Sequence, residues 1–258
     1  MEAVHICRRI IIRPGAQKKD YGMTFNLPPV AALPITRPYK HNTTLAKHED
    51  ANLHKMEKAP KFKLILGSSS ISRQAILADM GYEFTTMSAD IDEKGIRKEK
   101  PEDLVMALAE AKADAIISKL QNGELQKCYT TPTLLIAADT VVVYEGIVRE
   151  KPSCKEEARQ FMKDYSDRNA STVTSVFVSN LKTGVRRGEW DRVEIFFHEI
   201  PEEAIDNLID EGRVLSVAGG LIIEHPLVSP CVKEVVGTTD SVMGLPKALT
   251  EKLMNEVL

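Results

Sequence analysis

Short apolar runs alternate with amphipathic segments from Lys61 to the end of the chain. The first run, FKLILG, is typical of a strand, and RQAILADMG after it has helical spacing with a stop at Gly81. A longer helix is predicted over residues 101–119, where PEDL places acidic side chains near the positive end and apolar residues recur on one face. This alternation predicts an α/β domain over residues 61–258.

The most apolar run, LLIAADTVVV, predicts a strand in the centre of the sheet, followed by a hairpin turn at Gly146. A strand is also predicted over residues 82–92. The remaining expected elements are a helix at 155–166, strands at 171–181 and 189–200, a helix at 201–212, a strand at 230–237 and a last helix from Pro246.

The first part of the chain, residues 1–60, has a different composition. It combines basic residues with prolines and scattered Asn and Thr and has no sustained apolar period, which predicts a flexible extension. The basic stretch CRRIIIRPG also allows an organelle-targeting segment, although acidic residues from Glu2 to Glu57 weaken that interpretation. A cytoplasmic location is expected, with an organelle as the alternative.

Charge and motif content exclude several classes of protein. The 34 basic and 37 acidic residues give a formal net charge of -3, so no overall field attracts nucleic acid or anionic lipid. No apolar run reaches the roughly 18 residues that span a bilayer. The four cysteines are far apart and the histidines form no ligand pair, which favours reduced thiols and argues against zinc chemistry. The P-loop, dinucleotide-binding and nucleophile-elbow motifs are also missing from the sequence.

A serine-rich loop joins the first predicted strand to the first helix. In LILGSSSISRQ, Ser68, Ser69 and Ser70 precede a helix that carries Arg73 in its first turn. Backbone N–H groups at a helix start, hydroxyls and a guanidinium all suit phosphate oxygens, so the loop is a candidate phosphate site. The alternative is that each serine only caps the helix.

Acidic side chains occur at two candidate metal positions. Asp90, Asp92 and Glu93 follow a predicted strand and supply hard oxygen ligands for Mg²⁺ or Mn²⁺, unless they form only a solvated turn. Asp139 interrupts the apolar run IAADTVVV. Because an unpaired buried carboxylate is costly, we expect Asp139 at a strand end that faces a cleft, a cation or strong donors.

Two lysines are further candidates: Lys112 in AEAKADA and Lys151 in EKP. Most lysines are solvated surface charges. Cleavage of a triphosphate, however, builds negative charge on the phosphoryl and leaving-group oxygens, which Mg²⁺, Lys and Arg stabilise. Lys112 and Lys151 are therefore candidate phosphate ligands.

Taken in order, these segments resemble the Maf family of nucleotide pyrophosphatases from about Lys61 to Leu258. The resemblance rests on LILGSSSISRQAIL, on DIDEKGI with EDLVMALAEAKA, on AADTVVV with EKP, and on VMGLP. It implies an α/β fold similar to that of inosine triphosphate pyrophosphatases, with an elongated mixed sheet flanked by helices, a cleft between two lobes and often a homodimer. The implied reaction converts a nucleoside triphosphate to a monophosphate and pyrophosphate.

The resemblance also implies a role for each candidate residue. Asp139 would be the general base that activates water, and Glu93 with Asp139 would hold a divalent cation, Mg²⁺ or Mn²⁺. The expected phosphate-binding residues are Ser68, Ser69, Arg73, Lys112 and Lys151.

The base specificity is left open at the positions where the chain departs from the family. After the serines many members have Pro-Arg-Arg, where this chain has Ile-Ser-Arg with Ser72 in the middle, and the family's AGAYGIQG is AGGLIIEHP here. Thr140 matches the branch that prefers thymidine and uridine triphosphates, whereas Glu224 resembles the branch that acts on methylated guanosine triphosphate. Glu224 could instead face solvent. The alternative functions are a nucleotide-binding regulator that lost efficient catalysis and, less favoured, a structural module.

Overall fold

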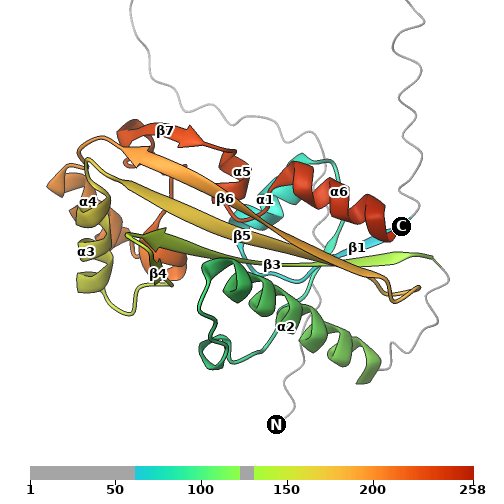
Figure 1. Cartoon of the computed structure of the whole chain (residues 1–258). Coiled ribbons are helices and arrows are strands. Elements are labelled where there is room, and N and C mark those ends of the chain that lie inside the picture. Colours follow the sequence, from blue (N-terminus) through green and yellow to red (C-terminus); the bar gives the residue numbers. More distant parts are fainter. Residues whose placement is uncertain (1–61, 123–130) are drawn as a thin grey trace, which may run out of the picture. The chain divides into compact units, whose positions relative to one another are not determined.

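The computed structural model describes residues 62–122 and 131–258, which form a seven-stranded mixed sheet with helices on both faces (Figure 1). The strand order is β2-β1-β3-β5-β6-β7, and β4 pairs with β3. This arrangement confirms the predicted α/β fold. The extension over residues 1–60 and its possible targeting segment lie outside the described residues, as do Cys7 and Cys128.

The strands are β1 (Lys63–Leu66), β2 (Thr85–Thr86), β3 (Thr133–Tyr144), β4 (Ile147–Arg149), β5 (Asn169–Asn180), β6 (Arg186–Phe197) and β7 (Val232–Val236). The helices are α1 (Ile71–Asp79), α2 (Pro101–Asn122), α3 (Lys155–Tyr165), α4 (Glu202–Glu211), α5 (Thr239–Val242) and α6 (Lys247–Val257). Short 3-10 turns are η1 (Glu93–Gly95), η2 (Arg213–Ser216), η3 (Ala218–Gly220) and η4 (Ser229–Cys231). The sequence pattern does not predict α5 or the 3-10 turns.

Strand β3 is the centre of the sheet, as its apolar sequence predicts. It runs parallel to β1 and antiparallel to β4 and β5, and helices cover both of its faces. Leu134 and Ile136 pack with α1 and α6 on one face, while Leu135 and Ala137 pack with α2 on the other. Successive side chains of a strand point to opposite faces, so a strand covered on both faces must be apolar throughout.

One edge of β3 is open at its middle. On this edge β1 pairs only as far as Ile136, and β4 begins to pair only at Val142. Within the described chain, no strand pairs with residues 137–141 on this side. The sheet therefore has a gap between β1 and β4, through which side chains from its two faces can approach each other.

The strand predicted over residues 82–92 is mostly wrong. Only Thr85 and Thr86 pair with a neighbour, because β1 is short and ends beside them. Further along, the Asp92 side chain accepts a hydrogen bond from the Gly95 N–H and caps the turn η1, which is incompatible with an extended strand. The acidic segment is a loop and a turn beside the open edge of β3.

A second lobe covers the far end of the sheet. Its core joins β6 and β7 to α3 and α4, with Tyr165, Ile195 and Leu208 fully buried. The Tyr165 hydroxyl donates to the Gly219 carbonyl at 3.0 Å, and the Gly219 N–H donates to the Glu150 carbonyl at 2.8 Å. None of the described helices combines the length and apolar composition needed to cross a membrane.

Replacing Gly219 by Ala should destabilise the fold strongly. Gly219 has φ +60, and an added Cβ would lie 2.6 Å from Val142 Cβ and 2.8 Å from the Tyr165 hydroxyl oxygen. Gly184→Ala is the matched control, because Gly184 has φ +76 with nothing within 4 Å of an added Cβ. We expect Gly184→Ala to cost about 1–2 kcal/mol from the left-handed backbone alone.

The Gly219 variant should lose about a further 1–3 kcal/mol from overpacking. Urea denaturation of both variants measures the difference. Equal losses of unfolding free energy in the two variants would contradict the prediction, because they would show that the segment around Gly219 accommodates the added methyl group without strain.

Candidate active site

A cleft of about 490 Å³ follows the gap between β1 and β4. The loop before α1, the middle of α2, the exposed edge of β3, the end of β4 and the loop around η3 all contribute to its walls. Its lining includes these candidate residues from the sequence: Ser68, Ser69, Ser72, Arg73, Glu93, Lys112, Asp139, Thr140, Lys151 and Glu224.

Asp139 lies in the middle of β3 and not at a strand end, so that part of the expectation is wrong. Because its neighbour β1 stops at Leu66, the β3 edge is open here and the carboxylate faces the cleft without needing a strand end. The residue is only 7% exposed. The expected cation is present, since the Lys112 Nζ lies 2.5 Å from Asp139 Oδ1.

Lys112 is shared by two carboxylates. Its ammonium group lies 2.9 Å from Glu93 Oε1 in addition to its contact with Asp139, and its side chain is only 12% exposed. The neighbouring turns of α2 are anchored in the core by Leu108 and Ile116, so the backbone that carries Lys112 is fixed. The lysine is thus a buried charge with a defined place, unlike an ordinary surface lysine.

The two carboxylates have opposite electrostatic environments. Burial raises the pKa of Asp139, although Lys112 and Arg73 oppose the shift. Burial acts in the same direction on Glu93, but the hydrogen bond and charge of Lys112, helped by Lys151 and Arg73, outweigh it and lower the pKa of Glu93. Paired groups whose pKa values are pushed apart are typical of acid–base sites.

Arg73 ties three parts of the cleft together. Its Nε donates to the Gly244 carbonyl at 2.8 Å, its Nη2 to Thr140 Oγ1 at 2.9 Å and its Nη1 to Ser68 Oγ at 3.3 Å. Gly244 has φ +99, and a Cβ there would lie 3.0 Å from both Arg73 Nε and Thr140 Oγ1. The guanidinium is therefore a fixed cation at the cleft wall.

The three serines of the loop have different environments. Ser70 is the N-cap of α1, since its Oγ accepts from the Arg73 N–H at 3.4 Å, which confirms the capping alternative for this serine. Ser68 is buried and accepts from the Ser70 N–H. Ser69 is exposed and lines the cleft.

Lys151 also lines the cleft, and its charge contributes to the lowered pKa of Glu93.

The far end of the cleft contains the positions that depart from the family pattern. Ser72 Oγ donates to Glu224 Oε1 at 3.4 Å, so helix α1 and the loop after η3 meet here. Glu224 is exposed but faces the cleft. Leu221 and Ile223 also line this end and give it an apolar wall.

The acidic cluster is only partly in the site. Asp90 pairs with Lys119 at 2.5 Å and Asp92 caps η1, so of the three acids only Glu93 belongs to the cleft lining, and its role as a metal ligand stays a prediction. In the described part of the chain, no group of three or more His, Cys, Asp or Glu residues could hold a metal ion. The predicted metal ligands that line the cleft are Glu93 and Asp139, whose carboxylates contact the same lysine.

A polar contact beside Arg73 is not predicted by the sequence pattern. Thr174 on β5 lies directly across from Thr140, and their hydroxyl oxygens are 3.1 Å apart. Thr174 also donates to the Ser241 carbonyl at 3.0 Å. The signal for it was present in STVTSVF, where hydroxyl side chains recur within an otherwise apolar strand.

Comparisons with known proteins agree with this arrangement. A family model described as Maf-like protein matches residues 63–257. A 7-methyl-GTP pyrophosphatase from Dictyostelium discoideum is 39% identical over 196 residues, which cover 75% of this chain and 96% of that protein. A dTTP/UTP pyrophosphatase from Agathobacter rectalis is 32% identical over 192 residues, covering 72% and 93%. A dTTP/UTP pyrophosphatase from Porphyromonas gingivalis is 32% identical over 203 residues, covering 78% and 96%.

Replacing Lys112 by Met should destabilise the protein by about 3–5 kcal/mol, because removal of one partner leaves buried carboxylate charge without compensation. Lys119→Met on the same helix is the matched control. Its side chain is 38% exposed and contacts the exposed Asp90, so its loss should cost under about 1 kcal/mol. Chemical denaturation at neutral pH measures both values.

The cost of Lys112→Met should also depend on pH. Without Lys112 the pKa of Asp139 rises further above its unfolded value, so the folded state holds a proton that the unfolded state releases. Stability of the variant relative to wild type should therefore fall as pH rises above about 4. A difference that stays constant between about pH 5 and pH 8 would contradict the shared role of Lys112.

Proposed function

The chain belongs to the Maf-like family, and on this premise we propose that it hydrolyses a nucleoside triphosphate to the monophosphate and pyrophosphate. The observation that carries the proposal is the buried Asp139 carboxylate in a cleft whose lining includes the cationic side chains of Arg73, Lys112 and Lys151. The relatives named as pyrophosphatases support the same reaction class.

Asp139 acts as the general base. Its carboxylate faces the cleft, and burial raises its pKa, which makes it a stronger proton acceptor than an exposed Asp. It takes a proton from a water molecule whose oxygen attacks phosphorus. The bond between the α-phosphorus and the bridging oxygen breaks, and pyrophosphate leaves with that oxygen.

The cations of the cleft stabilise the developing charge. Arg73 is held by Thr140 and the Gly244 carbonyl, so it is oriented before substrate binds. Lys112 lies beside the base, and Lys151, which follows β4, also lines the cleft. Preorganised cations of this kind stabilise the transition state more than mobile ones, because they need no reorganisation during the reaction.

Glu93 and Asp139 are the residues that would hold Mg²⁺ or Mn²⁺. Carboxylate oxygens of both residues contact the Lys112 ammonium group, and Mg²⁺ in phosphoryl-transfer sites is usually bound by one or two carboxylates together with substrate phosphates and water. The ion would neutralise phosphate charge and polarise the phosphorus. Glu93, with its lowered pKa, is suited to a charged ligand.

Glu224 reads the base. A carboxylate only accepts hydrogen bonds. Guanine offers two adjacent donors, N1–H and the 2-amino group, on the edge that pairs with cytosine, whereas uracil and thymine offer one N–H between two carbonyls, so Glu224 favours a guanine-type base. The 39% identical relative is named for 7-methyl-GTP, which supports the same preference. The cytoplasmic location and the homodimer stay predictions.

Asp139→Asn should lower pyrophosphate release by about 10²- to 10⁴-fold, the usual contribution of a general base. The carboxamide keeps the shape of the side chain, so the fold should be retained. Purified wild type and variant are incubated with GTP, 7-methyl-GTP, UTP and dTTP, and pyrophosphate and orthophosphate are measured separately. Turnover of the variant at the wild-type rate would remove Asp139 from the mechanism.

The same assay distinguishes a pyrophosphatase from the main alternative, a nucleotide-binding regulator that lost efficient catalysis. Wild-type protein that binds nucleotides but releases no pyrophosphate would be a nucleotide-binding regulator, for which the missing second arginine and the altered AGGLIIEHP segment are the motivation. Orthophosphate as the sole product would indicate a phosphatase.

Removal of divalent cations should abolish turnover. With a chelator present pyrophosphate release is expected to fall close to zero and to return when excess Mg²⁺ or Mn²⁺ is added. Glu93→Gln should require a higher metal concentration for half-maximal activity, because an amide is a weaker ligand than a carboxylate. Asp92→Asn, at the N-cap of η1 and adjacent in sequence, is the control that should leave this concentration unchanged. Full activity in the chelator would refute a metal requirement.

A further inference from the structure

The segment that carries Glu224 consists of two consecutive turns with His225 at their common corner. The His225 N–H donates to the Ile222 carbonyl at 3.1 Å, which closes a turn with Glu224 as its third residue. The His225 carbonyl accepts from the N–H groups of Val228 at 2.9 Å and Ser229 at 2.8 Å, which closes the next turn. The position of Glu224 therefore depends on that of His225.

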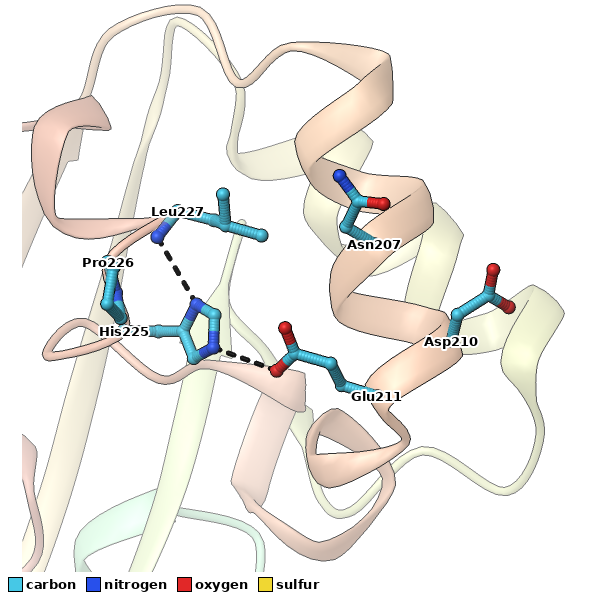
Figure 2. A pocket seen from close by; sticks show the side chains of 6 residues that line it. All are labelled: Asn207, Asp210, Glu211, His225, Pro226 and Leu227. Carbon is cyan, nitrogen blue, oxygen red and sulfur yellow. Dashed lines mark hydrogen bonds and ion pairs between the residues drawn. The ribbon is translucent and has the colours of Figure 1, made fainter. Parts of the chain in front are cut away.

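The side chain of His225 fixes this corner in one orientation. Its Nδ1 accepts from the Leu227 N–H at 3.2 Å, so the ring hydrogen of the neutral imidazole lies on Nε2. That Nε2 donates to Glu211 Oε2 at 2.9 Å. Figure 2 shows the ring between these two partners, with Glu211 on the facing helix and Leu227 on the same loop. His225 is buried, at 8% exposure.

Glu211 is a firm anchor because helix α4 is held on its neighbour α3. The apolar face of α4 is buried through Ile205 and Leu208. On the outer side Arg159 forms ion pairs with Asp206 and Glu202. Glu211 is the last residue of this helix, which is closed at Gly212 by a hydrogen bond from the Gly212 N–H to the Ile209 carbonyl.

We infer that His225, anchored by Glu211, is a positioning residue that directs the Glu224 carboxylate into the cleft. The inference rests on the proposed role of Glu224 in reading the base. His225 lies on the outer side of the loop, where it lines a hollow with Asn207 and Pro226, and it does not line the cleft (Figure 2). His225 therefore affects recognition of the nucleotide base only through Glu224, its neighbour in the chain.

Three variants separate the two contacts of the imidazole. His225→Asn retains an acceptor for the Leu227 N–H but is too short to reach Glu211, whereas His225→Gln retains a donor for Glu211 but lacks the acceptor. Glu211→Ala removes the anchor at a side chain that is 45% exposed, so it leaves the core intact even if a His225 variant unfolds. His198→Asn is the matched control, because the His198 side chain is exposed and lies outside the cleft lining.

The measured quantity is the ratio of kcat/KM for 7-methyl-GTP to that for UTP. Glu224→Ala should lower this ratio by about 5- to 150-fold, the discrimination that a well-placed polar contact to a base provides. His225→Asn, His225→Gln and Glu211→Ala should each lower it by about 2- to 30-fold, with kcat for UTP nearly unchanged. In the Glu224→Ala background the same three changes should have no further effect.

A second readout does not need turnover. The Glu224, His225 and Glu211 substitutions are combined with Asp139→Asn, and dissociation constants are measured for 7-methyl-GTP and UTP. A ratio that stays at the wild-type value in folded His225 and Glu211 variants would overturn the inference. Equal losses with both nucleotides, or an undiminished effect in the Glu224→Ala background, would overturn it as well. If Glu224→Ala leaves both ratios unchanged, base reading by Glu224 is wrong and the inference falls with it, while the pyrophosphatase activity is judged separately by product release.

Discussion

The ammonium group of Lys112, shared by Asp139 and Glu93, is the interaction on which the site depends. Strand β3 is covered on both faces, so a carboxylate in its middle needs a compensating charge that does not come from water. Helix α2 supplies that charge from one face of the sheet. The same lysine helps to lower the pKa of Glu93, while burial keeps the pKa of Asp139 raised. One cation thereby stabilises the fold and separates two carboxylates into different chemical roles.

The shortness of β1 makes this arrangement accessible. A longer β1 would pair with β3 beyond Ile136 and close the sheet across Asp139. Because β1 ends at Leu66, the chain turns into the serine loop and α1, which lies on the face opposite α2. Arg73 and Lys112 then approach the same edge of β3 from opposite faces. The cleft is a consequence of where one strand stops, and it needs no separate active-site domain.

The hydrophobic pattern along the chain was sufficient to predict the helices and strands whose sequences are strongly periodic or continuously apolar. The period of α2 and the apolar run of β3 predicted both elements, and a charge within an apolar run marked Asp139. Pairing partners were not predictable in this way. The strand expected at 82–92 shrank to Thr85 and Thr86, because only the end of β1 is beside it. The mid-strand place of Asp139 likewise depends on where its neighbour ends, which no local pattern in β3 records.

The two ends of the cleft differ in how they are built. Phosphate-side groups such as Lys112 and Arg73 project from helices packed on the sheet, whereas the exposed Glu224 projects from a turn whose neighbours Ile222 and Ile223 are buried in the core of the second lobe. The exposed position of such a loop can change its side chain without disturbing the sheet, because the buried neighbours hold the loop backbone in the second lobe. The chemistry at Asp139 and the choice of base at Glu224 are therefore separable in this fold. This accounts for a chain that matches the family pattern at the phosphate-binding residues and departs from it at the residues expected to contact the base.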